Sequence, residues 1–518
     1  MALIVDSAHI NGQTIKDYTL DQQLWIYNGM DATTTSEIYS KLKPEDAAKR
    51  IYKFVLGMQG PALKMMRRGF NIDMNLKADL IYRLELRYFK LRDMLNYIVT
   101  KSFDIPEFNH RSHIQLKKLF YDVMKLPVQY KLDKVKKERV PSCDREALEK
   151  LEPYFYAGPI IRFLFELRDL EKKVQVLRTA VSPDFRMRCS YNIVGTKFGR
   201  WSSSSDAFGL GTNLQNVTDE MREIFIPDPG FKIAYADLEQ AESVCVAYLS
   251  NDQNYKAAIA SGDLHTYVCR LIFPQLKWTG DIKKDKEIAK APYYRMFDHR
   301  DIAKRGGHAT NYNATPFTVA TRLRIPRGMA EKFQADYFGG FPGIREWQAS
   351  VGRQIGAHSF LETPLGRKIW FFDRSDADET LRQAIAAGPQ SMTGDILNRG
   401  LYNVLYLEYA NPQIIQLLGQ VHDAIVFQYR PEYELHILPK VLEAMTIPVP
   451  VPGQGTMIIK TEVLVGWNWR KFDKEENPYG ITKWTPGERD KRQPPKATYG
   501  NNVLDRRVCT AHQPLLVA

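Results

Sequence analysis

The sequence is poor in the features that mark secreted, metal-stapled or membrane-spanning proteins. Its five cysteines are scattered along 518 residues without paired spacing, which argues against a disulfide framework and against a zinc site. No stretch approaches the roughly 18 consecutive apolar residues that a membrane-spanning helix needs. The N-terminus, Met1-Ala-Leu-Ile-Val-Asp-Ser, lacks the basic start and the apolar run of a signal peptide. We therefore expect a cytoplasmic protein in a reducing compartment, without a membrane partner.

The charge balance is basic, with a net charge of +12 and a pI near 9.2. Such a balance is consistent with a polyanionic partner such as nucleic acid, although a membrane-surface protein can have the same balance. The length is enough for a large core and several subdomains. Composition alone therefore leaves the functional class open.

Two short stretches each place an aspartate in or beside an apolar, strand-like run. Asp237 follows Phe231-Lys-Ile-Ala-Tyr-Ala236, and Asp423 lies between Gln420-Val-His422 and Ile425-Val-Phe427. A buried carboxylate is costly unless its charge is compensated. Two such carboxylates from distant segments can hold two Mg²⁺ ions for in-line phosphoryl transfer. Taken alone the pattern is weak, because an aspartate near a strand end is more often a turn or helix-capping residue.

Between these aspartates, residues 299–313 carry basic and ring side chains at intervals of four, which would form one stripe on a helix. The residues of this stripe are Arg300, Lys304, His308 and Tyr312. Two permanent cations followed by rings suit a triphosphate at one end and a base or sugar at the other. The alternative is a solvated basic face. Gly306 and Gly307 each cost about 1 kcal/mol in a helix relative to alanine, so they indicate a close approach of the backbone to another group.

The order of the Asp237 segment, the basic helix and the Asp423 segment resembles motifs A, B and C of the family A DNA polymerases, the group of bacterial polymerase I and phage replicases. Further stretches resemble other landmarks of that family and follow in the same order. They are Phe198-Gly-Arg-Trp-Ser-Ser203, Asn213-Leu-Gln-Asn216, Asp263-Leu-His265, Phe341-Pro-Gly-Ile-Arg-Glu346, Gly366-Arg-Lys368, Arg382 with Gln390, and Val465-Gly-Trp-Asn-Trp469. The resemblance spans roughly residues 60–470.

The resemblance implies an α+β chain with the right-hand polymerase fold, in which the palm is an antiparallel sheet and the fingers and thumb are helical. The expected parts are a remnant of an exonuclease-like domain over 1–55, the thumb and connecting helices over 56–185, the first part of the palm over 186–264, the fingers over 265–345, the second part of the palm over 346–470, and a basic, disordered tail over 471–518. Apolar residues at helical spacing over 80–95 agree with a helical thumb. The polar, Pro-rich composition after Trp469 indicates disorder.

The resemblance also implies template-directed DNA synthesis, with two Mg²⁺ ions, dNTP substrates and primer–template DNA as the partner. Asp237 and Asp423 would hold both ions, with the backbone carbonyl of Leu238 as an extra ligand. Lys304 would hold the triphosphate and protonate the departing pyrophosphate, and Glu242 would exclude a ribose 2′-hydroxyl. The implied nucleotide-binding set is Gln240, Glu242, His265, Arg300, Lys304, His308 and Tyr312. The implied DNA-binding set is Arg200, Asn213, Gln215, Asn216, Arg367, Arg382, Gln390 and His422.

Four residues depart from the family's pattern. His308 stands where Phe or Tyr is usual, Asn313 where Gly is usual, and Ala386 replaces the usual Asn before Gln390. Ala424 follows Asp423 where the family usually has Glu, so motif C lacks its second carboxylate. These changes leave the reaction type in place and affect speed, fidelity and selectivity among nucleotide analogues.

Residues 25–36 resemble the last motif of the family's 3′–5′ exonuclease domain, with Tyr27 and Asp31 in its Tyr-x-x-x-Asp pattern. The earlier carboxylate motifs of such a domain have no counterpart, so we expect no 3′–5′ exonuclease activity in this chain. Tyr27 and Asp31 would then either pack against the polymerase core or form half of a site that a separate exonuclease or replisome subunit completes.

The expected role is DNA replication, in the host cytoplasm if the chain is phage-encoded. One alternative is a single-subunit RNA polymerase, which Glu242 disfavours. The other is a catalytically silent DNA-binding replisome subunit, which would not need two aspartates together with Arg300 and Lys304.

Overall fold

The computed structural model describes residues 13–42, 46–133, 137–206, 209–294 and 297–495. Its centre is a five-stranded, antiparallel sheet with the strand order β13-β14-β8-β17-β18. The strands are β13 (Ile415–Val421), β14 (Ala424–Tyr429), β8 (Lys232–Leu238), β17 (Thr461–Gly466) and β18 (Thr482–Lys483). The mixture of helices with an antiparallel sheet agrees with the expected α+β class.

Helices cover this central sheet. They are α8 (Ala241–Leu249), α16 (Asp378–Ala410) and α17 (Glu434–Met445). All six residues of β14 are buried, as expected for a strand whose side chains are covered on both faces. Its sequence, Ala-Ile-Val-Phe-Gln-Tyr, is almost continuously apolar for the same reason.

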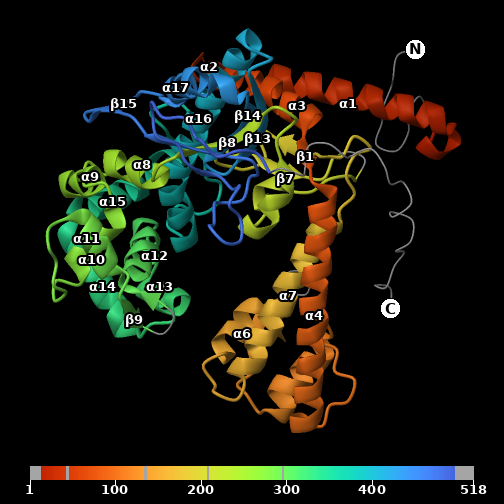
Figure 1. The fold of residues 1–518 in the computed structure, drawn as a ribbon, viewed down its shortest axis with the longest axis vertical. Helices are drawn as coiled ribbons and strands as arrows, with labels where there is room; N and C mark the ends of the chain where they lie inside the picture. The colour runs from red at the N-terminus through yellow and green to blue at the C-terminus, as the bar shows by residue number, and fades with distance from the viewer. Residues whose placement is uncertain (1–12, 43–45, 134–136, 207–208, 295–296, 496–518) are drawn as a thin grey trace.

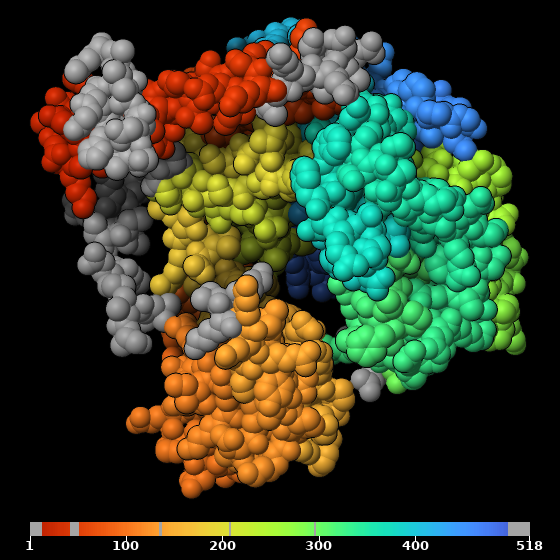
Figure 2. Space-filling model, turned by 180° about the vertical axis from the view of Figure 1, so that it is seen from behind, coloured from red at the N-terminus to blue at the C-terminus, as the bar shows by residue number. Residues whose placement is uncertain are grey.

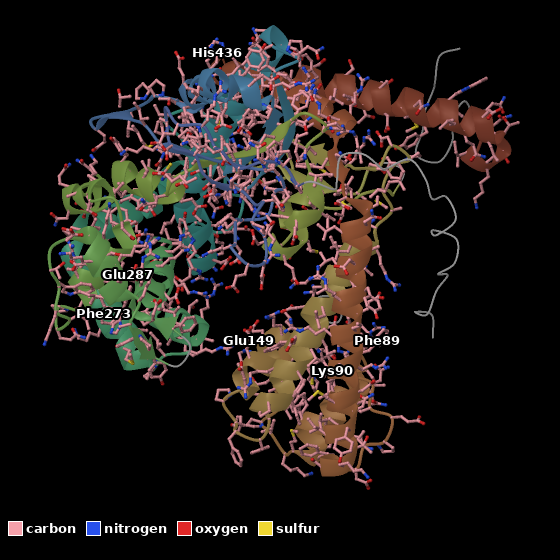
Figure 3. The ribbon with its side chains drawn as sticks, viewed as in Figure 1. Phe89, Lys90, Glu149, Phe273, Glu287 and His436 are labelled. Carbon is pink, nitrogen blue, oxygen red and sulfur yellow. The ribbon has the colours of Figure 1, made fainter. Side chains whose placement is uncertain are left out.

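A helical arm projects from the sheet (Figure 1). Its two long helices, α4 (Met74–Phe103) and α7 (Gly158–Arg178), pack along each other. The smaller elements are α5 (His113–Lys117), η2 (Lys118–Val123), α6 (Arg145–Leu151) and the hairpin of β2 (Tyr130–Leu132) with β3 (Arg139–Pro141). In Figure 3 Glu149 of α6 lies on the side of the arm nearer the second lobe of the molecule.

That second part, the helical lobe, has its own hydrophobic core. It contains α9 (Gln253–Ala260), α10 (Leu264–Ile272), α11 (Ile282–Ala289), β9 (Pro292–Tyr294), β10 (Phe297–Asp298), α12 (His299–Asn311), α13 (Pro316–Leu323), α14 (Arg327–Gly340), α15 (Pro342–His358), β11 (Phe360–Glu362) and β12 (Lys368–Trp370). Figure 2 shows an open hollow between this lobe and the arm. The central sheet lies above this hollow in Figure 1.

Three helices precede the arm: α1 (Leu20–Leu42), α2 (Asp46–Gly57) and α3 (Gln59–Arg68). Helix α1 extends away from the rest of the molecule in Figure 1. Tyr27 on α1 is 61% exposed, so the alternative in which this tyrosine packs against a polymerase core is wrong.

The remaining short elements join these parts. They are η1 (Ile15–Asp17), β1 (Phe70–Ile72), β4 (Arg186–Met187), β5 (Ser190–Asn192), β6 (Ser202–Ser204), η3 (Leu214–Asn216), η4 (Asp219–Ile224), β7 (Phe225–Ile226), η5 (Pro431–Tyr433), β15 (Val449–Val451) and β16 (Gly455–Met457). Among the described residues, no helix is long and apolar enough to cross a membrane.

The segment 471–495 corrects the expectation of a disordered tail for that part of the chain. Lys232, only 1% exposed, forms ion pairs with Glu434 at 3.2 Å and with Asp490 at 2.9 Å. Arg492 donates to the backbone carbonyl of Val465 at 2.7 Å, and Trp484 is buried. These contacts with the sheet outweigh the disorder-promoting composition. Residues 496–518 of the predicted tail lie outside the described part of the chain.

Candidate active site

The backbone of the central sheet brings two aspartates together. Asp237 lies near the end of β8 and is paired in register with Ala424 of β14. Asp423 lies in the tight turn between β13 and β14, and its carbonyl accepts a hydrogen bond from Leu238 N–H at 3.1 Å. His422 makes this turn possible with a left-handed φ of 54°, a conformation that histidine tolerates better than most residues.

The electrostatics of this pair are unfavourable in the protein alone. Burial, followed by the nearby charges of Asp423 and Glu462, raises the pKa of Asp237 to about 7. Burial also raises the pKa of Asp423, although the Arg200 guanidinium opposes that shift. Two carboxylates that resist ionisation in this way would ionise readily beside a cation.

The donor set therefore fits a hard divalent cation. Mg²⁺ prefers oxygen ligands and is usually bound through one or two carboxylates plus substrate phosphates. No group of three or more His, Cys, Asp or Glu side chains suited to a metal occurs within the described ranges. The candidate protein ligands are therefore the Asp237 and Asp423 carboxylates and the Leu238 carbonyl.

Glu242, on the first turn of α8, is held by two partners. Its carboxylate accepts hydrogen bonds from Arg200 and from the Tyr312 hydroxyl. Burial, and then the charge of Glu242, raises the pKa of Tyr312 well above the ordinary value, so this hydroxyl remains a donor. Arg200 also contacts the Asp423 carboxylate at 3.4 Å. Its guanidinium therefore links Glu242 to Asp423.

A cavity of about 460 Å³ opens beside the aspartates, within the range typical of small-molecule sites. Eight of the predicted site residues line it: Asp237, Leu238, Gln240, Glu242, His265, Lys304, His308 and Asp423. The side chains of Lys304 and His308 are exposed on α12. Lys304 and His308 of the predicted stripe and the two aspartates of the sheet therefore face a common space.

His265 is neutral in this environment. Burial, followed by the positive charge of Arg300, lowers its pKa to about 4. At neutral pH the imidazole is therefore uncharged and interacts in the cavity by hydrogen bonding. Lys304 and Arg305, both exposed, are the permanent cations of the cavity wall.

Arg300 is not among the residues that line the cavity, although its charge acts on His265. Its Nη2 donates to both carboxylate oxygens of Asp263, each at 3.0 Å. Asp263 in turn caps α10 by accepting from Thr266 N–H at 3.1 Å. The ion pair of Arg300 with Asp263 therefore joins the N-terminus of α10 to α12. The same guanidinium can contact a bound anion only with the donors that Asp263 does not use.

The two glycines of α12 are explained by packing against a neighbouring helix. A Cβ atom at Gly306 would lie 2.7 Å from the Phe333 ring of α14, and one at Gly307 would lie 3.1 Å from the Tyr337 ring. The close approach expected from the sequence is therefore to aromatic side chains of α14.

Several predicted DNA-binding side chains are engaged within the protein. Gln215 is buried and donates to Gln420 at 2.6 Å. Arg367 forms a two-pronged pair with the fully buried Asp395, at 2.9 and 2.6 Å. These contacts give both residues a structural role at the sheet and α16.

The other predicted DNA-binding residues are more accessible or only locally bonded. Asn213 accepts from Ser203 Oγ at 2.6 Å, and Arg382 pairs with Glu379 at 2.9 Å. Asn216 and His422 are exposed, and Gln390 is half-buried on α16. None of the eight residues of the predicted DNA-binding set is among the described residues that line the cavity.

Some residues of the site were not predicted from the sequence. Ser243, Tyr255, Asn311 and Tyr337 also line the cavity. Tyr255 and Tyr337 both bond the Asn311 side chain, at 2.9 and 2.8 Å, so they fix the end of α12. In the sequence the two tyrosines show only the apolar spacing that is typical of any core residue, so nothing there marks them as residues of the site.

Glu462 was also not predicted. It lies on β17 directly opposite Asp237 in the register, and its charge contributes to the raised pKa of that aspartate. Motif C carries alanine at position 424, but the sheet supplies this neighbouring carboxylate from another strand.

The family model and the relatives that match this chain are all described as DNA polymerases. The family model described as DNA polymerase family A matches residues 87–471. The DNA polymerase I of Chloroflexus aurantiacus is 27% identical over 479 residues, covering 86% of this chain and 46% of that protein. The thermostable DNA polymerase I of Thermus filiformis is 27% identical over 425 residues, covering 78% of this chain and 46% of that protein. The chain therefore spans less than half the length of these relatives.

A solved structure shares the fold. It is the POL domain of Pol1 from M. smegmatis in complex with DNA primer-template and dNTP, with a TM-score of 0.66 and 22% identity. The match covers 80% of this chain and 70% of that one.

Proposed function

This chain belongs to DNA polymerase family A, and from that premise we propose that it adds deoxynucleotides to a primer 3′-hydroxyl under the direction of a template strand. The observation that carries the proposal is the cavity in which Asp237 and Asp423 face the basic side of α12. A binding protein without catalysis has no need for buried carboxylates whose ionisation is this unfavourable.

In this proposal the central sheet is the palm, the helical lobe is the fingers and the arm is the thumb. The open hollow between the arm and the lobe supports a primer–template path there (Figure 2). The cavity with Asp237 lies where the sheet meets α12 of the lobe.

Two Mg²⁺ ions would be held by Asp237 and Asp423 with the Leu238 carbonyl, and when bound they supply activation of the primer hydroxyl and neutralisation of the leaving phosphates. Lys304 would orient the triphosphate and donate a proton to the departing pyrophosphate from its ammonium group. His265 would add a neutral hydrogen bond to the phosphate chain. His308, in edge contact with Tyr312 at 4.8 Å, would bound the sugar side.

Glu242 would provide selection against ribonucleotides. Its carboxylate is fixed by Arg200 and Tyr312, so it cannot move aside without breaking both contacts. A ribose 2′-hydroxyl would compete for the same space. This fixed position supports DNA rather than RNA synthesis.

Primer extension tests the proposal. The purified chain should extend a labelled primer–template with dNTPs and Mg²⁺, and should incorporate rNTPs far less well. Asp237→Ala and Asp423→Ala should abolish extension while leaving primer–template binding nearly intact, because binding depends mainly on many phosphate contacts. Asp373→Ala, at an exposed loop carboxylate, is the matched control and should extend normally. Near-normal extension by either site variant refutes the assignment, and equal use of rNTPs identifies an RNA polymerase.

We also propose that the chain alone does not excise mismatched 3′ ends. Tyr27 and Asp31 lie on the exposed helix α1, where a separate exonuclease or replisome subunit would have access to them. A role in phage DNA replication remains a prediction from the sequence resemblance.

A further inference from the structure

A second concave surface lies away from the catalytic cavity. It encloses about 630 Å³ between α3, β4 and the C-terminal end of α16. Five cations line it: Lys64, Arg67, Arg68, Arg186 and Arg188. We call this concave surface the arginine pocket.

Backbone carbonyls hold the guanidinium groups of the arginine pocket in fixed positions. Arg68 donates to Leu417 O at 2.6 Å, Arg188 donates to Arg67 O at 2.9 Å, and Arg186 donates to Gly69 O at 3.1 Å. A guanidinium has five donors, so these bonds orient each group without exhausting its capacity. Preorganised arginines are suited to phosphate recognition because their planar fork matches two oxygen atoms.

The positive charge of the arginine pocket exceeds the negative charge that faces it. Carboxylate partners are Asp184 for Arg188, Asp228 for Arg186, and Glu408 for both Lys64 and Arg68. Three carboxylates thus face five cations. Arg67 is exposed, and its side chain makes no hydrogen bond or ion pair with any residue in the described part of the chain. The pocket therefore has room and charge for an anion.

An aromatic row continues the pocket along α16. Tyr402, Tyr406 and Tyr409 follow at helical spacing, with ring centroids 5.0 and 6.3 Å apart. Tyr406 and Tyr409 are each 56% exposed. The Lys64 ammonium lies 4.1 Å from the centre of the Tyr409 ring, so the row and the cations form one surface.

This surface is remote from the proposed catalytic aspartates. Asp228 of the pocket precedes the start of β8, whereas Asp237 lies near the end of that strand. Leu417 belongs to β13, and α16 ends just before that strand starts. The seven-residue strand β8 spans about 20 Å, and the two sites lie at its opposite ends. In Figure 1 α3 lies near the top, above the start of the arm, whereas α12 lies at the lower left of the sheet.

We propose that the arginine pocket and the tyrosine row bind single-stranded DNA at a site distinct from the primer–template path. Single-stranded nucleic acid is bound by a cationic groove that follows the phosphates and by exposed aromatic rings on which bases stack. Both parts are present here in direct contact. A duplex would use only the cations, because its bases are already stacked inside the helix and present no faces to the tyrosines.

Fluorescence anisotropy of a labelled short oligothymidylate measures this binding in the full chain. The oligothymidylate is titrated in the presence of saturating unlabelled hairpin primer–template, which occupies the catalytic path. Binding should persist under these conditions. Tyr406→Ala and Tyr409→Ala should each weaken it about tenfold, the effect of losing one stacked base. Arg67→Glu should weaken it further and reduce its salt dependence by about one phosphate contact.

Matched controls make one tyrosine-to-alanine change and one cation-to-glutamate change away from the pocket. Tyr433→Ala and Lys440→Glu change an exposed tyrosine and an exposed lysine on η5 and α17, and they should bind oligothymidylate as the parent does. All variants should extend the hairpin primer at the parental rate. Extension and oligothymidylate binding are measured separately. A parent that binds the single strand but does not extend the primer would therefore count against the proposed polymerase function and not against this site.

Three results would overturn the inference. Complete displacement of the oligothymidylate by the hairpin would mean that one site binds both. Parental affinity in all three variants would show that these side chains do not bind the single strand. A blunt duplex competing as well as the single strand would assign the surface to duplex phosphates alone.

Discussion

Replacing Asp237 with asparagine should stabilise the metal-free protein while abolishing catalysis. The pKa of Asp237 is raised from 3.8 to about 7 by burial and by neighbouring carboxylates. Ionised Asp237 therefore destabilises the folded state relative to the unfolded chain. Asparagine has nearly the same shape and carries no charge, so it removes that penalty.

The sign and size of the effect follow from the two pKa values. Below pH 4, Asp237 is protonated in both states and does not lower the free energy of unfolding. As the pH rises towards 7, this free energy falls progressively, because Asp237 ionises first in the unfolded chain. One pKa unit corresponds to about 1.4 kcal/mol, so the full loss is roughly 4 kcal/mol above pH 7. At pH 5 only about 1.6 kcal/mol of it has appeared. The advantage of Asp237→Asn should thus grow by about 2 to 3 kcal/mol between pH 5 and pH 8.

Urea unfolding followed by tryptophan fluorescence, with EDTA present, measures this difference at both pH values. Asp373→Asn, which changes an exposed carboxylate, is the control and should show no such growth. Added Mg²⁺ should stabilise the parent more than Asp237→Asn, because a ligand stabilises only the state that binds it. A stability difference that stays flat from pH 5 to pH 8 would refute the view that burial opposes ionisation of Asp237.

Four further outcomes are expected. Glu242→Ala should raise incorporation of rNTPs relative to dNTPs in single-nucleotide extension; unchanged selectivity would place the discrimination elsewhere. Gly306→Ala should destabilise the protein by about 1 to 3 kcal/mol, because the new methyl group overlaps the Phe333 ring, whereas Gly328→Ala, which meets no neighbour, should not. Trp469→Ala should cost about 3 to 5 kcal/mol in urea unfolding, since its buried ring stacks on Phe70 at 5.3 Å; a loss below 1 kcal/mol would contradict this. The purified chain should leave a mismatched 3′ end intact with Mg²⁺, and excision without a partner would disprove this expectation.

The residues that surround the catalytic cavity could be predicted because their chemistry is written in short segments. Asp237 and Asp423 each interrupt an apolar run, and the four-residue spacing on α12 is visible without any knowledge of contacts. The structure places Lys304 and His308 of that stripe beside both aspartates. Their individual roles remain predictions.

Long-range contacts could not be predicted in the same way. Gln215 bonds Gln420, which lies 205 residues further along the chain, so its burial has no local signal. The pairing of Lys232 with Asp490 likewise overrides the Pro-rich composition that indicated disorder. The tyrosine row of α16 is indistinguishable from core periodicity until α3 is placed beside it.

The order of strands in the central sheet has a consequence for synthesis on the ribosome. The strand β8 lies between β14 and β17, both of which are translated long after it. At about 5 to 20 residues per second, Asp237 emerges about 10 to 40 seconds before Asp423. During that interval a strand of seven residues, five of them buried in the finished protein, has neither hydrogen-bonded neighbour. Nascent chains of this protein are therefore expected to need protection from association until the last third of the sequence has been made.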